Sequence, residues 1–427
     1  MSKYRVDESF ETIGAFWIFG QEDKKFTGTL SSRKGLVEIQ TSPIYADLDD
    51  AALRASMLEM TGAIDLQQVN AICGFTTDRR CTLLNSVILD GGGLTDFASR
   101  QQVKRKLYRA MRTVMGLHLE SSEAMSIDGA AYYFTKIHRL LPMPWSSQLA
   151  EQSTTHVVPW QAKEVFRFTS DELQAEVTCQ VFARGSTRPM KAVSVKSVPR
   201  IKIVSHRPQS VDWYTSLAFR FENFFTLFLG TSVGLKHVQL FQGDDDGWVV
   251  QKMRRRKEKV NLQTWVRCPL QSVASALMKW LAVPRDQQLV ELNMLSMMRK
   301  SNIFGETEFL TLAQTLEGFG RIRFGGKRPR RAKVDQLIRQ TYDMIGSDLA
   351  HKLVGDRAEF TNKVIQTRDY YTHLGNPKGT FVAKSNKELF LLNKRLHAFL
   401  RCVMLIDLGI SEDHIKEPVL YQATRWR

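Results

Sequence analysis

The stretch that decides the C-terminal fold is Lys363-Val364-Ile365-Gln366-Thr367-Arg368-Asp369-Tyr370-Tyr371-Thr372-His373. Apolar and small side chains recur through it at helical spacing, and they are Phe360, Val364, Thr367 and Tyr371. Gly375 and Pro377 follow it and are typical helix stop signals. The pattern predicts a helix that buries one stripe and carries Arg368 and His373 near its end.

Arg368 and His373 place a permanent cation close to a proton-transfer group. Imidazole serves as acid or base near neutrality, because its unperturbed pKa is about 6.5. Guanidinium donates two parallel hydrogen bonds to a phosphate and keeps its charge. These groups are the minimum equipment for cutting RNA without a metal, by attack of the 2′-hydroxyl on the adjacent phosphate. The bare spacing also arises by chance on solvated surfaces, so it does not decide the function alone.

The two residues lie about 500° apart around an ideal helix, which is about 140° after whole turns are removed. They converge only if the last turn loosens or if a partner subunit supplies one of them. The reaction needs both a base and an acid, and one copy of the motif offers one histidine. Because a two-fold axis brings each motif to its own twin, we predict a homodimer with a composite site.

The stretch resembles the HEPN signature, in which a histidine follows an arginine by a few residues and a polar residue comes directly after the arginine. The N-terminal runs Gly14-Ala15-Phe16-Trp17 and Gly28-Thr29-Leu30 resemble the opening of the ApeA-type N-terminal domain. Together they are similar to ApeA-like anti-phage HEPN ribonucleases.

The resemblance implies that Arg368 and His373 are the catalytic pair and that Asp369 is the supporting polar residue, where the family often has asparagine. It implies RNA cleavage to 2′,3′-cyclic phosphate and 5′-hydroxyl ends, with no metal and no cofactor. It also implies abortive infection, in which cellular RNA, with tRNA as a candidate, is cut after a phage-encoded trigger is sensed.

The predicted fold class is α+β. Short β-rich runs, such as 15–19, 81–84, 131–134 and 176–182, favour a sandwich-like N-terminal domain over 1–208. Helical insertions are expected in it, at 51–57 and in a basic stretch at 101–112. A mixed segment at 209–284, with a helix at 213–229, belongs to this ApeA-type sensor module. An all-α HEPN helical bundle follows at 285–427.

Apolar stripes predict the bundle helices. The first carries Leu289, Leu292, Leu295 and Met298 on one face, and the second carries Phe309, Leu312, Ala313, Leu316 and Phe319. A third spans 334–349. The last begins with a capping box of Ser385 and Glu388 and buries Leu389, Leu392, Leu396, Phe399, Leu400 and Val403.

Composition bounds the partners. The chain has 427 residues, 43% apolar and 24% charged, with a net charge of +16, which favours nucleic acid without excluding other polyanions. It has no long uncharged apolar run and no secretion signal, which predicts no membrane span. Five scattered cysteines without a CxxC pair predict reduced thiols in the cytoplasm.

Secondary candidates have two interpretations each. The basic loop formed by Lys327, Arg328, Arg330, Arg331 and Lys333 either binds RNA phosphates or is a solvated linker. For the cluster at 252–257 a solvated hairpin face is favoured, and for the aspartates at 244–246 a turn is favoured over a metal site. Glu317 either orients Arg368 or is an ordinary surface glutamate, and His397 either nears the site or is structural.

The leading hypothesis is a metal-independent endoribonuclease whose N-terminal domain senses or restrains it. The alternative is a non-catalytic HEPN module that binds RNA or dimerises. A third class, a partner of a nucleotidyltransferase, is disfavoured because the chain carries no transferase motif.

Overall fold

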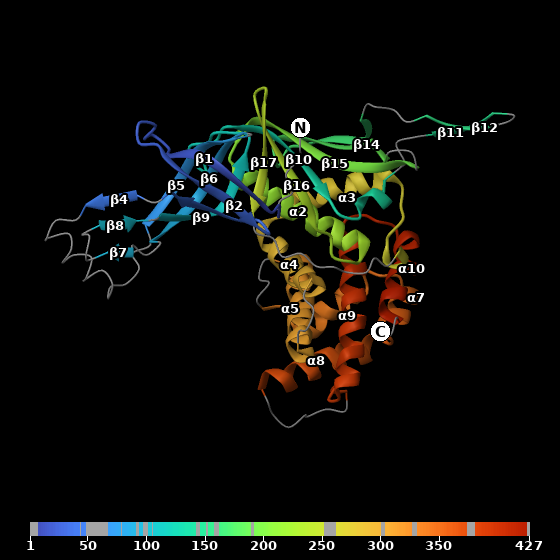
Figure 1. Cartoon of the computed structure of the whole chain (residues 1–427). Coiled ribbons are helices and arrows are strands. Elements are labelled where there is room, and N and C mark those ends of the chain that lie inside the picture. Colours follow the sequence, from blue (N-terminus) through green and yellow to red (C-terminus); the bar gives the residue numbers. More distant parts are fainter. Residues whose placement is uncertain are drawn as a thin grey trace.

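The structure is a computed structural model that describes residues 7–42, 44–47, 67–77, 79–90, 94–96, 101–104, 106–141, 146–150, 153–157, 162–188, 192–251, 262–299, 304–326, 331–373 and 381–424. A β-rich layer lies on one side and a helical bundle on the other (Figure 1). A β-rich N-terminal half followed by an all-α C-terminal part confirms the predicted fold class. No helix in these ranges is both long and apolar enough to cross a membrane.

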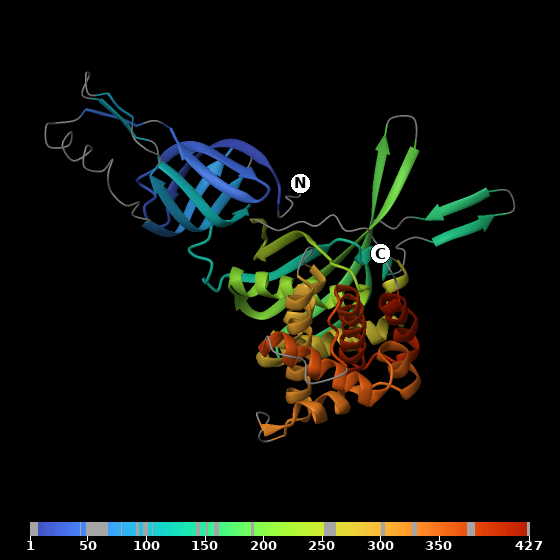
Figure 2. The same ribbon diagram turned by 90° about the horizontal axis from the view of Figure 1, so that it is seen from below.

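The main sheet has twelve strands. They are β1 (Phe10–Ile18), β2 (Phe26–Arg33), β3 (Leu36–Thr41), β5 (Gln67–Thr76), β6 (Arg80–Asp90), β9 (Lys106–Met115), β10 (Ile127–Phe134), β13 (Lys163–Ser170), β14 (Ala175–Arg188), β15 (Ala192–Gln209), β16 (Leu235–Gln242) and β17 (Asp245–Gln251). A short sheet of β4 (Ile44–Asp47), β8 (Gln101–Lys104) and β7 (Leu94–Asp96) extends beyond the barrel end, and the hairpin of β11 (Ser146–Ala150) and β12 (Ser153–Val157) projects separately (Figure 2).

Six of these strands close into a barrel, in the order β9-β3-β2-β1-β5-β6, because β6 pairs back with β9. Its interior is apolar, with Phe16, Leu30, Ile39 and Leu83 each fully buried. Closure removes the open edges that a flat sheet would present. The β-rich domain predicted for this region is confirmed, but its strands close into a barrel with extra strands and do not form the expected sandwich-like arrangement.

The basic stretch at 101–112 is not helical, so that prediction is wrong. It forms β8 and most of β9. Burial alternates along β9, with Tyr108 and Ala110 inside the barrel and Arg109 exposed between them. Arg109 donates from Nε to Glu38 Oε1 on β3 at 2.7 Å. A period of two with cross-strand charge pairing is the strand pattern. The helical turn predicted at 51–57 lies outside the described residues.

The barrel continues into a second part of the sheet, because β17 pairs with both β9 and β16, and β10 lies between β16 and β15. The turn of the β16–β17 hairpin contains Gly243, whose φ of +55° is a conformation that glycine adopts freely. The hairpin predicted around the aspartates is present, with Asp245 and Asp246 already in the second strand.

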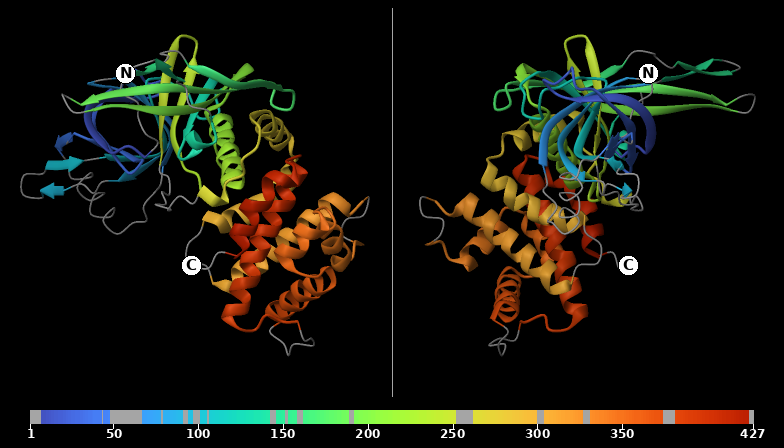
Figure 3. Two further views of the ribbon diagram at one scale, coloured as in Figure 1. Left: turned by 90° about the vertical axis from the view of Figure 1, so that its right-hand side faces the viewer. Right: turned by 60° about the vertical axis from the view of Figure 1, so that its left-hand side comes forward.

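Helix α2 (Val211–Leu229) lies against this second part of the sheet, and it confirms the buried helix predicted at 213–229. Ser210 caps its start by accepting a hydrogen bond from Trp213 N. Its other side contacts α3 (Leu270–Ala282), α4 and α9, so α2 lies between the sheet and the bundle (Figure 3). One hydrophobic core runs from β10 through α2 into the bundle.

The bundle contains α4 (Arg285–Arg299), α5 (Gly305–Phe324), α6 (Val334–Tyr342), α7 (Ser347–Val354), α8 (Arg357–His373), α9 (Asn386–Asp407) and α10 (Glu412–Thr424). The stripes predicted for α5 and α9 are all buried. The capping box of Ser385 and Glu388 is also confirmed. These two helices contact each other at the centre of the bundle.

Two bundle predictions are wrong in detail. The third helix, expected over 334–349, is two helices separated by a turn, and Gly346 N there donates to Glu412 Oε2 at 2.9 Å. In the first helix, Leu289 is 54% exposed, whereas Glu291 is 3% exposed. The buried face of α4 therefore includes a carboxylate that an apolar stripe does not reveal.

Candidate active site

Helix α8 carries the Arg-His motif and is anchored by the predicted stripe. Phe360, Val364 and Thr367 are buried. Thr367 Oγ1 accepts a hydrogen bond from Ala383 N at 3.1 Å, and Tyr371 Oη donates to Ala383 O at 3.2 Å. The stripe thus attaches the end of α8 to the segment that leads into α9. Gly375 and Pro377 lie outside the described residues.

Arg368 is half-buried and is held by two carboxylates from different helices. Its Nη1 donates to Glu317 Oε2 on α5 at 2.9 Å. Its Nε and Nη2 both donate to Asp369 Oδ1, at 3.2 and 3.0 Å. A guanidinium has five N–H donors in a fixed plane, so three bonds fix its position and two donors are left for a phosphate.

Glu317 is therefore an orienting residue rather than an unengaged surface glutamate. Its other oxygen, Oε1, accepts from Arg321 Nε and Nη2 at 3.0 and 2.6 Å. One carboxylate shared by two guanidinium groups cannot neutralise both. Asp369, whose side chain is 50% exposed, supplies the second negative charge. The site is close to neutral as it stands, and the weaker, more exposed carboxylate is the one a phosphate can displace.

His373 lies at the last described residue of α8, and it is exposed. The helix is regular through this position, so the last turn does not loosen to bring the imidazole towards Arg368. Within one chain the two side chains occupy different sides of the helix. The alternative in which a second copy supplies one of the two groups stays a prediction.

The basic loop is described only in part. Arg331 and Lys333 are exposed just before α6, and the carbonyl of Ala332 between them accepts from Arg321 Nη1 at 3.4 Å. Arg321 also contacts Glu317, so this end of the loop lies near the Arg368 cluster. Lys327, Arg328 and Arg330 lie outside the described residues, as does the cluster at 252–257.

His397 has a structural role within the bundle. It is 7% exposed, and its Nε2 lies 2.9 Å from Glu308 Oε1. Burial acts to raise the pKa of Glu308, but the hydrogen bonds and charge interactions of His397, Lys394 and Asn393 together outweigh burial, so the pKa lies below its ordinary value. Asn393 donates to the same carboxylate at 3.3 Å. This cluster ties α9 to α5 away from solvent.

The aspartates at 244–246 do not converge. Asp245 forms an ion pair with Arg80 at 3.6 Å, and Asp246 accepts from Gln239 within the hairpin. Within the described residues, no three side chains of histidine, cysteine, aspartate or glutamate gather as a metal site would require. The turn interpretation accounts for these residues.

Two family models match the chain. The ApeA N-terminal domain 1 matches residues 11–266, which is more than half of the chain, and the Apea-like HEPN matches residues 310–414. The chain belongs to the ApeA-like HEPN family. No curated protein and no solved structure gave a match.

Membership places this ApeA-like protein among defence-associated nucleases, and HEPN domains are generally ribonucleases. The HEPN match begins on α5 and includes α8, so it covers Glu317 as well as Arg368 and His373. The matched ranges do not test the domain limits predicted at residues 208 and 284, and these limits stay predictions.

Two buried charged residues were not identified in the sequence analysis. Arg401 on α9 is fully buried and binds backbone carbonyls of α2, although its position inside an apolar helix suggested only core packing. Glu291 lines a cavity next to α2, and a charged residue flanked by Val290 and Leu292 could have signalled it. In both cases the signal is a charge on a face that must be buried.

Proposed function

We propose that this ApeA-like protein is a metal-independent endoribonuclease of an anti-phage abortive-infection system. The observation that carries the proposal is the guanidinium of Arg368, positioned by Glu317 and Asp369 and still half-exposed, on the same helix as an exposed His373. A positioned cation and a proton-transfer group are what 2′-hydroxyl attack on a phosphate requires.

Each residue has a separate task. Arg368 binds the scissile phosphate with its two remaining N–H donors and stabilises the charge that develops in the transition state. His373 moves the proton, either from the 2′-hydroxyl or to the departing 5′-oxygen. Asp369 and Glu317 hold the guanidinium plane. The products are 2′,3′-cyclic phosphate and 5′-hydroxyl ends, and DNA, which has no 2′-hydroxyl, is not cut.

The protein acts as a homodimer through its bundle. In an in-line displacement the 2′-hydroxyl and the departing 5′-oxygen lie on opposite sides of the phosphorus, so a single imidazole does not reach both. Helix α8 also keeps His373 away from its own Arg368. Two motifs facing each other across a two-fold axis supply both groups. Arg331 and Lys333, with the rest of the basic loop, extend the phosphate-binding surface.

The physiological substrate is cellular RNA in the cytoplasm, with tRNA as the leading candidate. The N-terminal module responds to a phage-encoded trigger and controls the bundle, to which it is joined through α2. Activity must be restrained in uninfected cells, since an unrestrained ribonuclease would kill the host.

The test maps new RNA 5′-hydroxyl ends after mild expression of wild type, Arg368→Ala and His373→Ala, with and without EDTA in lysates. Wild type should generate ends that persist in EDTA, and both variants should lose them by about 100-fold or more. Arg357→Ala, at the start of the same helix, and His351→Ala, on α7, are matched controls and should cut normally. Ends that disappear with EDTA would refute metal independence.

The alternative function is a module that binds RNA or dimerises without cutting. It predicts no new ends from wild type and RNA binding that is unchanged in His373→Ala. Gel-shift assays run beside the end mapping separate the two functions.

A further inference from the structure

Helix α5 carries a second arginine next to the candidate active site. Glu317 and Arg321 lie four residues apart on α5, so their side chains share one face of the helix. Glu317 Oε2 accepts a hydrogen bond from Arg368 Nη1 at 2.9 Å, and Glu317 Oε1 accepts from Arg321 Nε and Nη2 at 3.0 and 2.6 Å. One carboxylate therefore joins two guanidinium groups, which come from α5 and α8.

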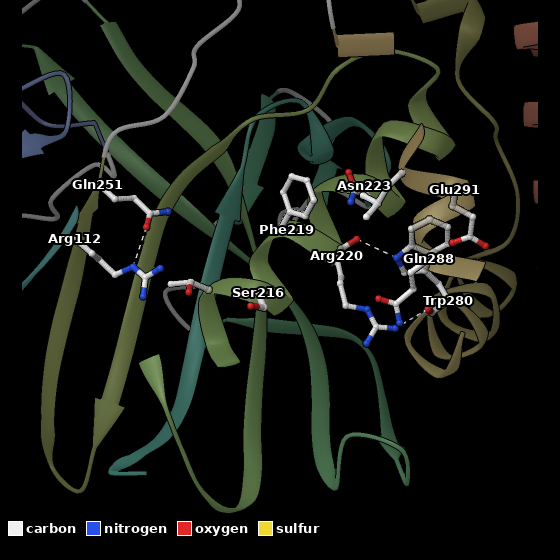
Figure 4. A pocket seen from close by; sticks show the side chains of 11 residues that line it. Arg112, Ser216, Phe219, Arg220, Asn223, Gln251, Trp280, Gln288 and Glu291 are labelled. Carbon is white, nitrogen blue, oxygen red and sulfur yellow. Dashed lines mark hydrogen bonds between the residues drawn. The ribbon is translucent and has the colours of Figure 1, made fainter. Parts of the chain in front are cut away.

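Other arginines in the described part of the chain have different partners. Arg323, two residues further along α5, pairs with Asp407 on α9. Arg220 on α2 donates to the carbonyl oxygen of Trp280 at 2.9 Å, as Figure 4 shows, and this partner is neutral. At Glu317, by contrast, each oxygen of one carboxylate binds a different cation. The state of one oxygen thus affects the bond that the other oxygen makes.

Arg321 fixes the orientation of the Glu317 carboxylate. Its two bonds to Oε1 leave Oε2 directed at Arg368 Nη1, so Glu317 makes one bond to Arg368. Arg321 is also attached to the end of the basic loop, because its Nη1 donates to Ala332 O at 3.4 Å. The carboxylate is thus held by a side chain that is itself attached to two places, α5 and the segment before α6.

The number of bonds between Glu317 and Arg368 decides how many donors a phosphate can use. With one bond to Glu317 and two to Asp369, Arg368 keeps two of its five N–H donors. A carboxylate whose second oxygen has lost its partner can turn and bind a guanidinium through both oxygens, which is a favoured geometry of this pair. Arg368 would then keep one donor instead of two, and its charge would be more fully neutralised.

We propose that Arg321 is a positioning residue of the nuclease site. By occupying Glu317 Oε1, it keeps the carboxylate from binding Arg368 through both oxygens and so leaves two donors for the scissile phosphate. Arg321 acts through Glu317, and it neither moves a proton nor binds that phosphate. This role rests on the proposed function, because it concerns the phosphate that this function places at Arg368.

A purely structural role would leave a different signature. Glu317 and Arg321 form an i,i+4 ion pair whose side chains are 23% and 26% exposed. Such pairs add little to the stability of a helix. A loss of activity that exceeds any loss of folded protein therefore reports on the site, and a higher KM reports on phosphate binding.

A double-mutant cycle on the purified full-length protein tests the role, with steady-state cleavage of one defined RNA as the readout. Arg321→Gln should lower kcat/KM by about 30-fold or more and raise KM by at least about 3-fold, because one phosphate donor of Arg368 is lost. When Glu317→Gln is already present, no carboxylate can bind through two oxygens, so Arg321→Gln should change kcat/KM by less than about 5-fold. Arg321→Lys can still donate to Oε1 and should lose less activity than Arg321→Gln.

Arg323→Gln is the matched control, because Arg323 lies on the same helix and pairs with Asp407 instead of Glu317. It should leave kcat/KM within about 2-fold of wild type. An equal loss from Arg321→Gln with and without Glu317→Gln would overturn the role, since it would mean that Arg321 contacts RNA directly. Equal losses in Arg321→Lys and Arg321→Gln would also overturn it.

The wild-type protein separates this role from the proposed function. If wild type cuts RNA and Arg321→Gln cuts equally well, the role of Arg321 is overturned and the nuclease stands. If wild type binds RNA without cutting it, the nuclease is refuted, and the same cycle is measured on the dissociation constant of RNA, which Arg321→Gln should raise by at least about 3-fold. A wild-type protein that neither cuts nor binds RNA would overturn both.

Discussion

At the scale of single residues, the Arg368 cluster shows a guanidinium that is positioned and neutralised by the same carboxylates. Glu317 is itself fixed by Arg321, whereas Asp369 bonds Arg368 alone from a half-exposed position. A phosphate that binds the two remaining N–H donors of Arg368 meets the negative charge of Asp369 beside them, so the two anions compete for the guanidinium charge. Under the proposed function, we expect the aspartate to hold the arginine in place at a cost in affinity for RNA.

Replacing Asp369 tests this competition. Asp369→Asn keeps an acceptor for the guanidinium and removes the negative charge that a phosphate meets, so KM for RNA should fall by about 3- to 10-fold while kcat changes little. Steady-state cleavage of one defined RNA gives both constants. Glu317→Gln is the contrasting variant, because loss of the anchoring charge should lower kcat. A rise in KM for Asp369→Asn would contradict the competition.

Glu291 gives a prediction in pH. Burial raises its pKa to about 7, so the folded protein keeps a proton on Glu291 that the unfolded chain has already released. The contribution of Glu291 to the free energy of unfolding is fully present below about pH 4.5. It is lost as pH rises through about 7, and the loss amounts to up to about 3 kcal/mol. Glu291→Gln resembles the protonated form. Its melting temperature should therefore match wild type near pH 5 and exceed it at pH 8, and a constant difference across this range would contradict the assignment.

At the scale of elements, the sequence specified some helices fully and others not. The α9 stripe and its Ser385–Glu388 capping box are local signals, and both are confirmed. The prediction of a helix at β9 is wrong. The strand is set by its pairing with β3, where Arg109 bonds Glu38, and this contact is distant in the sequence. The contact between Glu317 and Arg368 joins helices that are separated by α6 and α7, so a single sequence could offer it only as one of two possibilities.

Arg401 shows how one element completes another. It donates from α9 to the carbonyls of Leu227, Phe228 and Thr264, each at 2.7 Å. The first two belong to the last turn of α2, whose carbonyls have no partner inside their own helix. Burial lowers the pKa of Arg401 to about 9.

Replacing Arg401 should destabilise the chain. Arg401→Met removes the donor from the buried carbonyls of Leu227 and Thr264, whereas Phe228 O keeps its hydrogen bond from Val266 N at 3.1 Å. The variant should cost about 3–5 kcal/mol of unfolding free energy, measured by urea denaturation. Arg395→Met on the exposed face of the same helix is the control and should cost less than about 0.5 kcal/mol. If Arg401→Met lowers the free energy of unfolding no more than Arg395→Met does, the α2–α9 junction is held by apolar packing alone.

At the scale of the whole molecule, the proposed function requires a second proton-transfer group besides His373. The second part of the sheet, α2 and the bundle share one hydrophobic core, whereas the barrel interior is a separate cluster. The end of α8 lies at the far end of the bundle from the sheet (Figure 1). The N-terminal module therefore cannot provide the missing proton-transfer group directly. A second copy can, if the bundles meet near α8.

Mixed dimers test whether the active site is composite. Wild type and His373→Ala are co-expressed with different tags, and the mixed dimer is isolated by two successive affinity steps. If each copy cuts alone, the mixed dimer keeps half of the wild-type rate. If one histidine acts as base and the other as acid, its rate should fall by about 100-fold or more, because one proton transfer loses its catalyst. A mixed dimer of wild type and His351→Ala is the control and should keep the full rate. Half of the wild-type rate in the mixed dimer with His373→Ala would exclude the shared site, and each Arg-His pair would remain a candidate catalyst on its own.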